Sequence, residues 1–361
     1  MAKRVSNLIG KEFGHRNGRH PAFPKRAVGA AGVAAVGAAA AAGKSFLDRR
    51  DREERAARAF ALRTDETVPD GVRRIARGQI DIALDALRGD GDREAGVHEA
   101  RKALKRLRTL LRLVRDNLDP HLYRHELHNF REIGRGLAVA RDSQVAVETL
   151  AAVMKRFSGE LPEVDVGPLR SRLAAEHDDA ERRLNSGTAV LGPATRELKA
   201  ARARTAAWTL AHGDFEALSP GLRRIYRRGR RATATAQTDP STENLHELRK
   251  RVKDLWYTTQ ILRRPAPSKM RSSAHHVSDL LGEDHDLALL RTQALRHRRE
   301  LVGTEALTAL TGVIDRRRAQ LRDEALRECE GLYSRKPRRF VQRIERRWRK
   351  RMPSAAEPAA S

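Results

Sequence analysis

The stretch from Val97 to Leu118, VHEARKALKRLRTLLRLVRDNL, decides the fold of this chain. Its apolar residues recur every three or four positions and therefore share one face of an α-helix, namely Leu104, Leu107, Leu111, Val114 and Leu118. A second row has the same rhythm but is basic, namely Arg101, Lys105, Arg108, Arg112 and Arg115. The two rows lie roughly 100° apart around the helix. We expect this helix to bury its leucines, to hold its cations at the edge of a groove, and to end at Asp119-Pro120.

The acids in this stretch are too few for an ordinary solvated surface. Only Glu99 and Asp116 are acidic, whereas a solvated charged face usually carries an acid one turn from each base. The whole chain is similarly biased, with 73 Lys and Arg against 47 Asp and Glu in 361 residues and a net charge of +26. This excess predicts a polyanionic partner, namely nucleic acid, an anionic membrane surface or a phosphate polymer.

Two other features of the composition narrow the choice. Aromatic residues make up 4% of the chain, which disfavours single-stranded nucleic acid because its bases usually stack on aromatic rings. Cys329 is the single cysteine, which excludes an intrachain disulfide framework and a cysteine-based zinc site. We therefore expect a cytoplasmic protein.

The segment Leu245–Arg264, LHELRKRVKDLWYTTQILRR, repeats the opening stretch. A constant offset of 148 relates seven pairs of identical residues, which are His98 and His246, Glu99 and Glu247, Arg101 and Arg249, Lys102 and Lys250, Lys105 and Lys253, Leu107 and Leu255, and Arg115 and Arg263. A weaker match at offset 144 relates residues 137–142 to 281–286. A repeat of this length indicates a duplicated half-domain of about four helices. We predict an all-α fold of two pseudo-symmetric four-helix bundles whose long helices line one basic cavity.

The remaining sequence places the boundaries of this domain. Helical periodicity begins near Asp65, and Thr238-Asp239-Pro240 marks a turn after which Ser241 or Thr242 can cap a helix. We assign residues 1–64 to a disordered, low-complexity extension, 65–351 to the helical domain with halves 65–212 and 213–351, and 352–361 to a disordered tail. The Ala/Gly run 27–43 is interpreted as a linker. Its alternatives are a short membrane span, a signal peptide and a degenerate phosphate loop at 38–45; no transmembrane insertion is expected.

The doubled His-x-x-Arg-Lys-x-x-Lys element, with an L-G-x-x-x-D-like segment after each copy, resembles the CHAD domain (conserved histidine α-helical domain) over roughly residues 67–349. The resemblance implies two four-helix bundles, binding of inorganic polyphosphate and association with polyphosphate granules. It also implies that GLRRIYRRGRRA, residues 221–232, contributes cations. Together with the first basic row, the candidate polyphosphate-binding residues are His98, Arg101, Lys102, Lys105, Arg106, Arg108, Arg112, Arg223, Arg227, Arg230, His246, Arg249, Lys250 and Lys253.

The second copy departs from the first in its charges. Asp254, Trp256 and Gln260 stand where the first copy has Arg106, Arg108 and Arg112, so we expect the first half to bind more strongly. In the first L-G segment the glycine is replaced by Ala138. Whether the two repeated histidines contact the ligand or only support the helix is open.

Three other functions are weighed against polyphosphate binding. The alternative is a protein that binds nucleic acid without sequence specificity, which rests on charge alone. An enzyme is not expected, because we find no nucleophile–base pair and no E-x-E-x-K motif of the hydrolase domain fused to some CHAD proteins; no catalytic residue and no cofactor are assigned. A metal site is also not assigned, although His121, His125 and His128 share a helix face, and His275, His276 and residues 283–286 form a cluster.

The basic C-terminal segment 335–351, RKPRRFVQRIERRWRKR, also carries apolar residues on one side. It is interpreted as a final helix that extends the basic surface. A membrane-surface helix and a nucleic-acid-binding arm are the alternatives.

Overall fold

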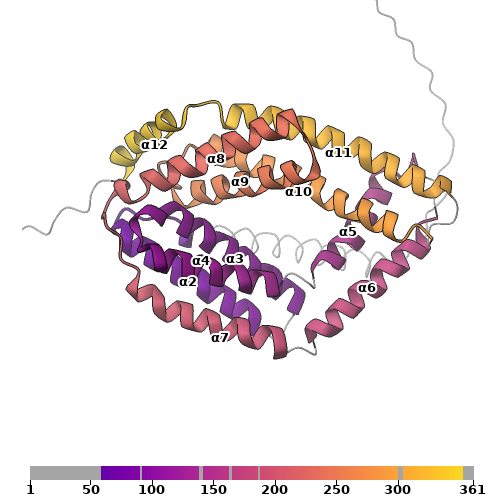
Figure 1. The fold of residues 1–361 in the computed structure, drawn as a ribbon, viewed down its shortest axis with the longest axis horizontal. Coiled ribbons are helices and arrows are strands. Elements are labelled where there is room, and N and C mark those ends of the chain that lie inside the picture. The colour runs from indigo at the N-terminus through magenta and orange to yellow at the C-terminus, as the bar shows by residue number, and fades with distance from the viewer. Residues whose placement is uncertain are drawn as a thin grey trace, which may run out of the picture. The chain divides into compact units, whose positions relative to one another are not determined.

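The computed structural model describes residues 58–89, 92–137, 141–161, 165–185, 188–299 and 304–352. In these residues the regular structure is helical, which confirms the predicted all-α class. The helices are α2 (Val68–Arg88), α3 (Arg93–Val114), α4 (Pro120–Gly136), α5 (Arg141–Arg156), α6 (Gly167–Asn185), α7 (Thr188–Arg204), α8 (Ser219–Thr238), α9 (Thr242–Ile261), α10 (Ser268–Arg296), α11 (Thr304–Leu332) and α12 (Pro337–Arg351) (Figure 1).

Short polar side chains begin several of these helices. Thr67 caps α2, Asp92 caps α3 and Asp119 caps α4, in each case by accepting hydrogen bonds from backbone N–H groups of the first turn. Ser241 caps α9 through the backbone N–H of Asn244, as the sequence allowed. The α3 helix differs from the prediction at its end, because the α-helix ends at Val114 and a 3₁₀ turn, η1 (Arg115–Asn117), carries the chain to the cap of α4.

The apolar row of α3 is buried as its spacing predicts. Leu104, Leu107, Leu111 and Val114 are each at most 1% exposed, and Leu118 is 5% exposed. They belong to one continuous hydrophobic core that also contains side chains of α2, α8, α9 and α12. Complete burial of a leucine side chain contributes about 2 kcal/mol of transfer free energy. The apolar face therefore anchors α3 and fixes the direction of its basic row.

Helix packing follows a similar pattern in the two predicted halves, 65–212 and 213–351. α2 packs on α3 and α7, and α8 packs on α9 and α12. In the first part α3 packs on α4 and α5 on α6, whereas in the second a single long α10 packs on both α9 and α11. A duplicated unit would pack in this way, but the duplication itself and the halves 65–212 and 213–351 stay predictions. The first of these ranges contains six described α-helices rather than the expected four or so.

The two parts meet where α3 packs against α8 and α9 (Figure 1). Gly221 of α8 makes a close approach possible, because a Cβ atom at this position would overlap the carbonyl group of Leu113. The side chain of Asn117 donates to the carbonyl of Ala217 across the same contact, at 3.0 Å. This junction brings the two repeated helices side by side.

All of the described residues fall in one compact unit. The predicted N-terminal extension, apart from residues 58–64, and the predicted tail, apart from Met352, lie outside the described residues; so do the Ala/Gly run and Ala138. None of the described helices is long and apolar enough to cross a membrane.

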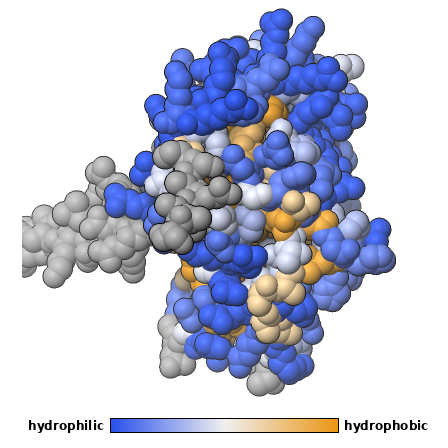
Figure 2. Space-filling view, turned by 90° about the vertical axis from the view of Figure 1, so that its left-hand side faces the viewer, coloured by the Kyte–Doolittle hydropathy of each residue, from blue (hydrophilic) through white to orange (hydrophobic). Residues whose placement is uncertain are grey.

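Figure 2 shows one face of the molecule, and hydrophilic side chains cover its upper part, at the end where α12 lies in Figure 1.

Candidate functional site

A cavity of about 690 Å³, the central cavity, lies between α3 and α9. It is lined by Arg101, Lys105, Arg108, Thr109, Arg112, Arg115, Tyr123, Leu127, Arg131, Arg228, His246, Arg249, Lys250, Arg251, Lys253, Asp254, Tyr257 and His285. Eleven of these eighteen described residues are Lys or Arg, and one, Asp254, is an acid. Both repeated helices therefore contribute cations to a single concave surface.

Eight of the fourteen predicted polyphosphate-binding residues line this cavity. They are Arg101, Lys105, Arg108 and Arg112 from α3, and His246, Arg249, Lys250 and Lys253 from α9. The four on α3 are spaced by four, three and four residues, so they share the helix face that turns toward α9. The spacing in the sequence is thus the physical reason that these side chains converge.

Three predicted residues of α3 do not line the cavity. Lys102 pairs with Glu99 at 2.9 Å on the helix surface, and His98 is half-buried one turn before the cavity wall. Arg106 is 9% exposed and faces α2, where its guanidinium donates to Gln79 at 3.4 Å and lies 5.5 Å from the ring centroid of Phe60. One residue corresponds to a rotation of about 100°, which turns Arg106 away from the face that carries Lys105.

The predicted arginines of α8 lie elsewhere. Arg223, Arg227 and Arg230 line a separate groove of about 610 Å³ with the first turn of α12, which we call the α8–α12 groove. The groove shares no lining residue with the central cavity. The sequence showed that these arginines share a helix face, but only the packing of α8 shows which neighbour that face meets.

Several lining residues were absent from the predicted set. Arg115 ends the basic row of the opening stretch, and Arg228 belongs to the basic segment of α8, so both carried a signal in the sequence. His285 lies in the second L-G segment and faces His246, with 4.9 Å between the ring centroids. Arg131 of α4 had no such signal, because no repeat or basic row marks it. It reaches the cavity only through the packing of α4 on α3.

Lys105 lines the central cavity among other cations. Burial is the main cause that lowers its pKa from 10.5 to about 7, and the positive charges of Lys253, Arg101, Arg249 and Arg108 contribute to the same shift. Two of these four cations come from α3 and two from α9, so Lys105 lies where the two basic walls meet. A lysine in such surroundings releases its proton readily when no anion is present.

The pKa values of two neighbouring groups, Arg108 and His246, are also lowered. Burial is the main cause that lowers the pKa of Arg108 to about 10, and the charge of Arg112 adds to it. Burial also lowers the pKa of His246, followed by the effects of His285 and Lys250. The Nε atom of Arg108 and the Nδ1 atom of His246 are buried and have no hydrogen-bond partner in the protein. Buried polar atoms of this kind are costly unless a ligand or water satisfies them.

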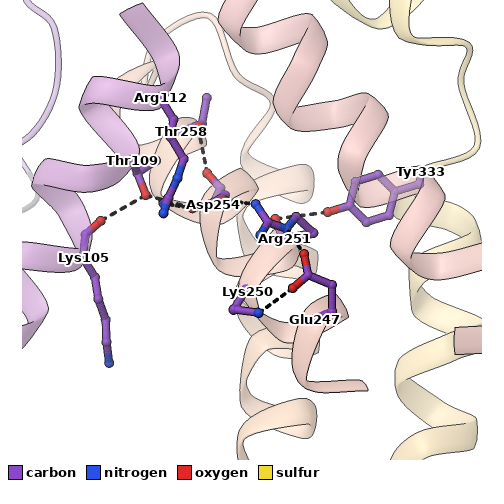
Figure 3. Close-up of polar contacts among 9 residues, drawn as sticks. All are labelled: Lys105, Thr109, Arg112, Glu247, Lys250, Arg251, Asp254, Thr258 and Tyr333. Carbon is purple, nitrogen blue, oxygen red and sulfur yellow. Dashed lines mark hydrogen bonds and ion pairs between the residues drawn. The ribbon is translucent and has the colours of Figure 1, made fainter. Parts of the chain in front are cut away.

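Asp254 is the acid that lines the central cavity, and its carboxylate binds two of the cations there, Arg112 and Arg251 (Figure 3). Its carboxylate accepts from Arg112 at 2.8 Å and from Thr109 at 3.3 Å, both on α3, and from Arg251 at 3.0 Å on its own helix. The side chain is buried, at 6% exposure. Asp254 therefore joins the two walls by an ion pair, and the side chain of Lys105 extends away from this network in Figure 3.

The wall of the cavity formed by α9 also carries acidic residues near its cations. Glu247 of α9 pairs with Lys250 at 2.5 Å and with Arg251 at 2.7 Å. In contrast, Arg108 and Arg131 on the α3 side make no ion pair with a described residue. The acids Glu247 and Asp254 thus both lie on α9.

A second cavity adjoins this site. Its volume is about 840 Å³, and its wall includes side chains of α5 and α10 together with Arg249 and Lys253, which also line the central cavity. Its lining is mixed, because Glu148, Asp279 and Glu283 oppose the cations. The second cavity is therefore less positive than the central cavity.

The histidines that the sequence suggested as metal ligands either pair with acids or are exposed. His275 pairs with Asp279 at 2.9 Å, and His276 pairs with Glu324 at 3.1 Å. His121, His125 and His128 are all exposed on α4. Within the described ranges, no group of three or more His, Cys, Asp or Glu residues lies in an arrangement that could hold a metal ion.

Comparison with known proteins gives one family. A family model described as "CHAD domain" matches residues 74–295. The chain is similar to the solved structure of PptA from Streptomyces chartreusis, with a TM-score of 0.54, 15% identity and coverage of 79% of this chain and 99% of that chain. It is also similar to the CHAD domain from the plant Ricinus communis, with a TM-score of 0.48, 17% identity and coverage of 80% and 94%. No curated protein matches the chain significantly.

Proposed function

The chain belongs to the CHAD domain family, a polyphosphate-binding family, and we propose that it binds inorganic polyphosphate in the central cavity without hydrolysing it. The observation that carries this proposal is the environment of Lys105. Burial, together with four nearby cations, lowers its pKa to about 7, and both repeated helices supply those cations. A protein that keeps like charges this close together loses stability unless an anion occupies the space between them.

The chemistry of the lining favours a phosphate polymer. Guanidinium groups bond two phosphate oxygens at once, and lysines add point charges. Cations one helical turn apart recur about every 5.4 Å along α3, which provides a row of contacts for an extended polyanion. Polyphosphate presents only charge and oxygen acceptors, and these are what the eleven cations of the cavity recognise.

The aromatic residues of the cavity argue against nucleic-acid bases as ligands. Tyr123 lies under the guanidinium of Arg115, with 5.4 Å between the ring centroid and Cζ. Tyr257 is buried and packs against the rings of Trp256 and Phe60. Both rings already have partners, whereas single-stranded nucleic acid is usually held by bases that stack on accessible rings. We therefore rank polyphosphate above nucleic acid.

The experiment is a binding assay with matched double variants. We expect Arg101→Gln/Lys105→Gln to weaken polyphosphate binding about tenfold or more, because each charged hydrogen bond to phosphate contributes roughly 1.5–3 kcal/mol. Arg170→Gln/Lys199→Gln removes the same two charge types from exposed positions on α6 and α7 that line no cavity reported above, and it should leave the affinity nearly unchanged. Equal losses in both variants would mean that overall charge, not the cavity, binds the polymer.

A third variant compares the two walls. Arg249→Gln/Lys253→Gln removes the corresponding residues of α9, and we propose a smaller loss than for the α3 pair, because α3 and η1 line the cavity with five cations whereas α9 lines it with four cations and Asp254. Duplex DNA is the competitor in the same assay. If DNA displaces polyphosphate at equal phosphate concentration, the protein is a general polyanion binder and the nucleic-acid alternative prevails. Release of orthophosphate during the assay would contradict a non-enzymatic role.

The cellular consequence we propose is recruitment to polyphosphate granules in the cytoplasm. A fluorescent fusion of the full chain should form foci that coincide with polyphosphate and disappear when the polymer is removed. The Arg101→Gln/Lys105→Gln variant should stay diffuse. Foci that persist without polyphosphate would show that the localisation does not depend on polyphosphate binding.

A further inference from the structure

The α8–α12 groove contains six cations. They are Arg223, Arg227, Arg230, Lys336, Arg338 and Arg339, and they come from one face of α8 and the start of α12. None of the six forms an ion pair with an acid in the part of the chain that the structure describes, and no acid lines the groove. Six exposed cations held around one concavity repel one another, and an anion between them would remove that repulsion.

The apolar side of α12 is fully used in packing. Phe340 stacks on Tyr226 with 3.9 Å between ring centroids, and the indole N–H of Trp348 donates to Asp214 at 2.8 Å. Val341 and Ile344 are buried with them. A membrane-surface helix needs its apolar face free to enter the lipid. The surface that α12 leaves to solvent is therefore charged, and the ligand it fits is a polyanion rather than a bilayer.

The exposed face of α8 connects the groove to the central cavity. It carries five exposed arginines, namely Arg223, Arg227, Arg228, Arg230 and Arg231, and α8 contains no acidic residue. Arg228 is exposed and lines the central cavity, whereas the preceding residue, Arg227, lines the groove. Consecutive residues lie about 100° apart around a helix whose overall diameter is roughly 10 Å. A polymer that leaves the cavity beside Arg228 needs only to cross α8 to reach the groove.

We propose that the α8–α12 groove is a second polyphosphate site, which binds a further stretch of the same polymer that occupies the central cavity. This inference rests on the proposed function. One polymer held at two sites gains avidity, because the second contact forms at a high effective concentration. Long chains then bind more tightly than short ones, since a short chain occupies the cavity alone.

The test compares two triple variants of α12 with two ligands. Lys336→Gln/Arg338→Gln/Arg339→Gln removes the cations that α12 gives to the groove. Arg346→Gln/Arg349→Gln/Lys350→Gln removes three exposed cations from the other end of the same helix, outside the groove. The ligands are tripolyphosphate and a polyphosphate many times longer than the cavity. Circular dichroism and thermal unfolding confirm that all variants are folded.

We expect the groove variant to lose about tenfold or more of its affinity for the long polymer and to keep its affinity for tripolyphosphate. The control variant should keep both affinities close to wild type. The salt dependence should also change, because each phosphate contact that is lost reduces the slope of log K against log salt by roughly 0.7. Equal weakening in the two triple variants, or an unchanged affinity for the long polymer, overturns the second site.

Failure of the proposed function gives a different result. If the wild-type chain binds neither ligand, or if Arg101→Gln/Lys105→Gln binds both as well as wild type, the central cavity is not the polyphosphate site. Duplex DNA is included as a third ligand. If the groove variant loses affinity for DNA but not for long polyphosphate, the groove is a nucleic-acid site and our proposal is wrong.

Discussion

Lys105 shows how a single residue couples charge to ligand binding. In the free protein its pKa is about 7, because the side chain is buried among four cations. A bound polyanion favours the charged ammonium and raises this pKa toward its ordinary value. Below pH 7 the lysine is charged both before and after binding, so affinity does not depend on its titration. Above pH 7 binding must be accompanied by uptake of a proton.

We therefore predict that polyphosphate affinity falls by up to about tenfold per pH unit as the pH rises above 7, since one proton is taken up. Lys105→Arg should remove this dependence, because arginine keeps its charge throughout this range. Lys102→Arg is the matched control, since Lys102 lies on the surface and pairs with Glu99, and it should retain the wild-type slope. Titration calorimetry in buffers of different ionisation enthalpy counts the protons. An identical pH profile for wild type and Lys105→Arg would exclude Lys105 as the titrating group.

The same pKa shift acts on the stability of the free protein. An unfolded chain keeps Lys105 protonated up to about pH 10, whereas the folded chain releases the proton near pH 7. The unfolded state binds more protons between these values, so the free energy of unfolding rises as the pH increases from 7 to about 10. Lys105 thus lowers the stability of the free protein at neutral pH, as expected for a residue that serves binding.

The crossing of helices α3 and α8 helps to position the basic residues of α3 and α8 that line the central cavity. Gly221 of α8 faces the backbone of Leu113, and a Cβ atom there would overlap the leucine carbonyl. Glycine is usually unfavourable inside a helix by roughly 1 kcal/mol relative to alanine. Its presence here is explained by close contact between the two helices, which a larger residue would separate.

We predict that Gly221→Ala lowers the melting temperature, because α8 must move away from α3. Gly78→Ala on α2 is the control, since a Cβ atom there meets nothing within 4 Å and the change improves helix propensity by up to about 1 kcal/mol. Thermal unfolding measured by circular dichroism should show the two variants shifted in opposite directions. A Gly221→Ala protein as stable as Gly78→Ala would show that the crossing is more adaptable than its geometry indicates.

At the scale of the whole molecule, Asp254 connects the two parts of the chain. It lies 142 residues from Arg112 in the sequence, yet the two side chains form an ion pair at 2.8 Å. Arg251 binds the other oxygen of the same carboxylate. Removing one member of a buried ion pair leaves the remaining charges uncompensated, which costs on the order of 3 kcal/mol or more.

We predict that Asp254→Asn unfolds at a lower temperature than wild type in the absence of ligand, because Arg112 and Arg251 lose their counter-charge. Long-chain polyphosphate should raise the melting temperature of this variant by more than it raises that of wild type, since the two arginines become available to phosphate. Asp323→Asn makes the same chemical change at an exposed position on α11 and should behave as wild type in both conditions. Equal ligand-induced shifts in all three proteins would place Asp254 outside the binding site.

The helical class, the burial of the leucine row and the presence of two basic rows could all be predicted from the sequence alone. These follow from periodicity, which describes how residues are distributed around one helix axis and needs no knowledge of neighbours. The spacing of Arg101, Lys105, Arg108 and Arg112 placed them on one face of α3, and the structure brings all four to the central cavity.

Tertiary structure decided what each of those faces meets. Arg106 belongs to the same basic segment but turns to α2, Arg223 and its neighbours turn to α12, and Arg131 joins the cavity from α4 with no signal in the sequence. The low pKa of Lys105 also needs α9, because half of the cations around it are contributed by that helix. The physical reason is that electrostatic energies depend on distances between groups far apart in the chain, and only packing sets those distances.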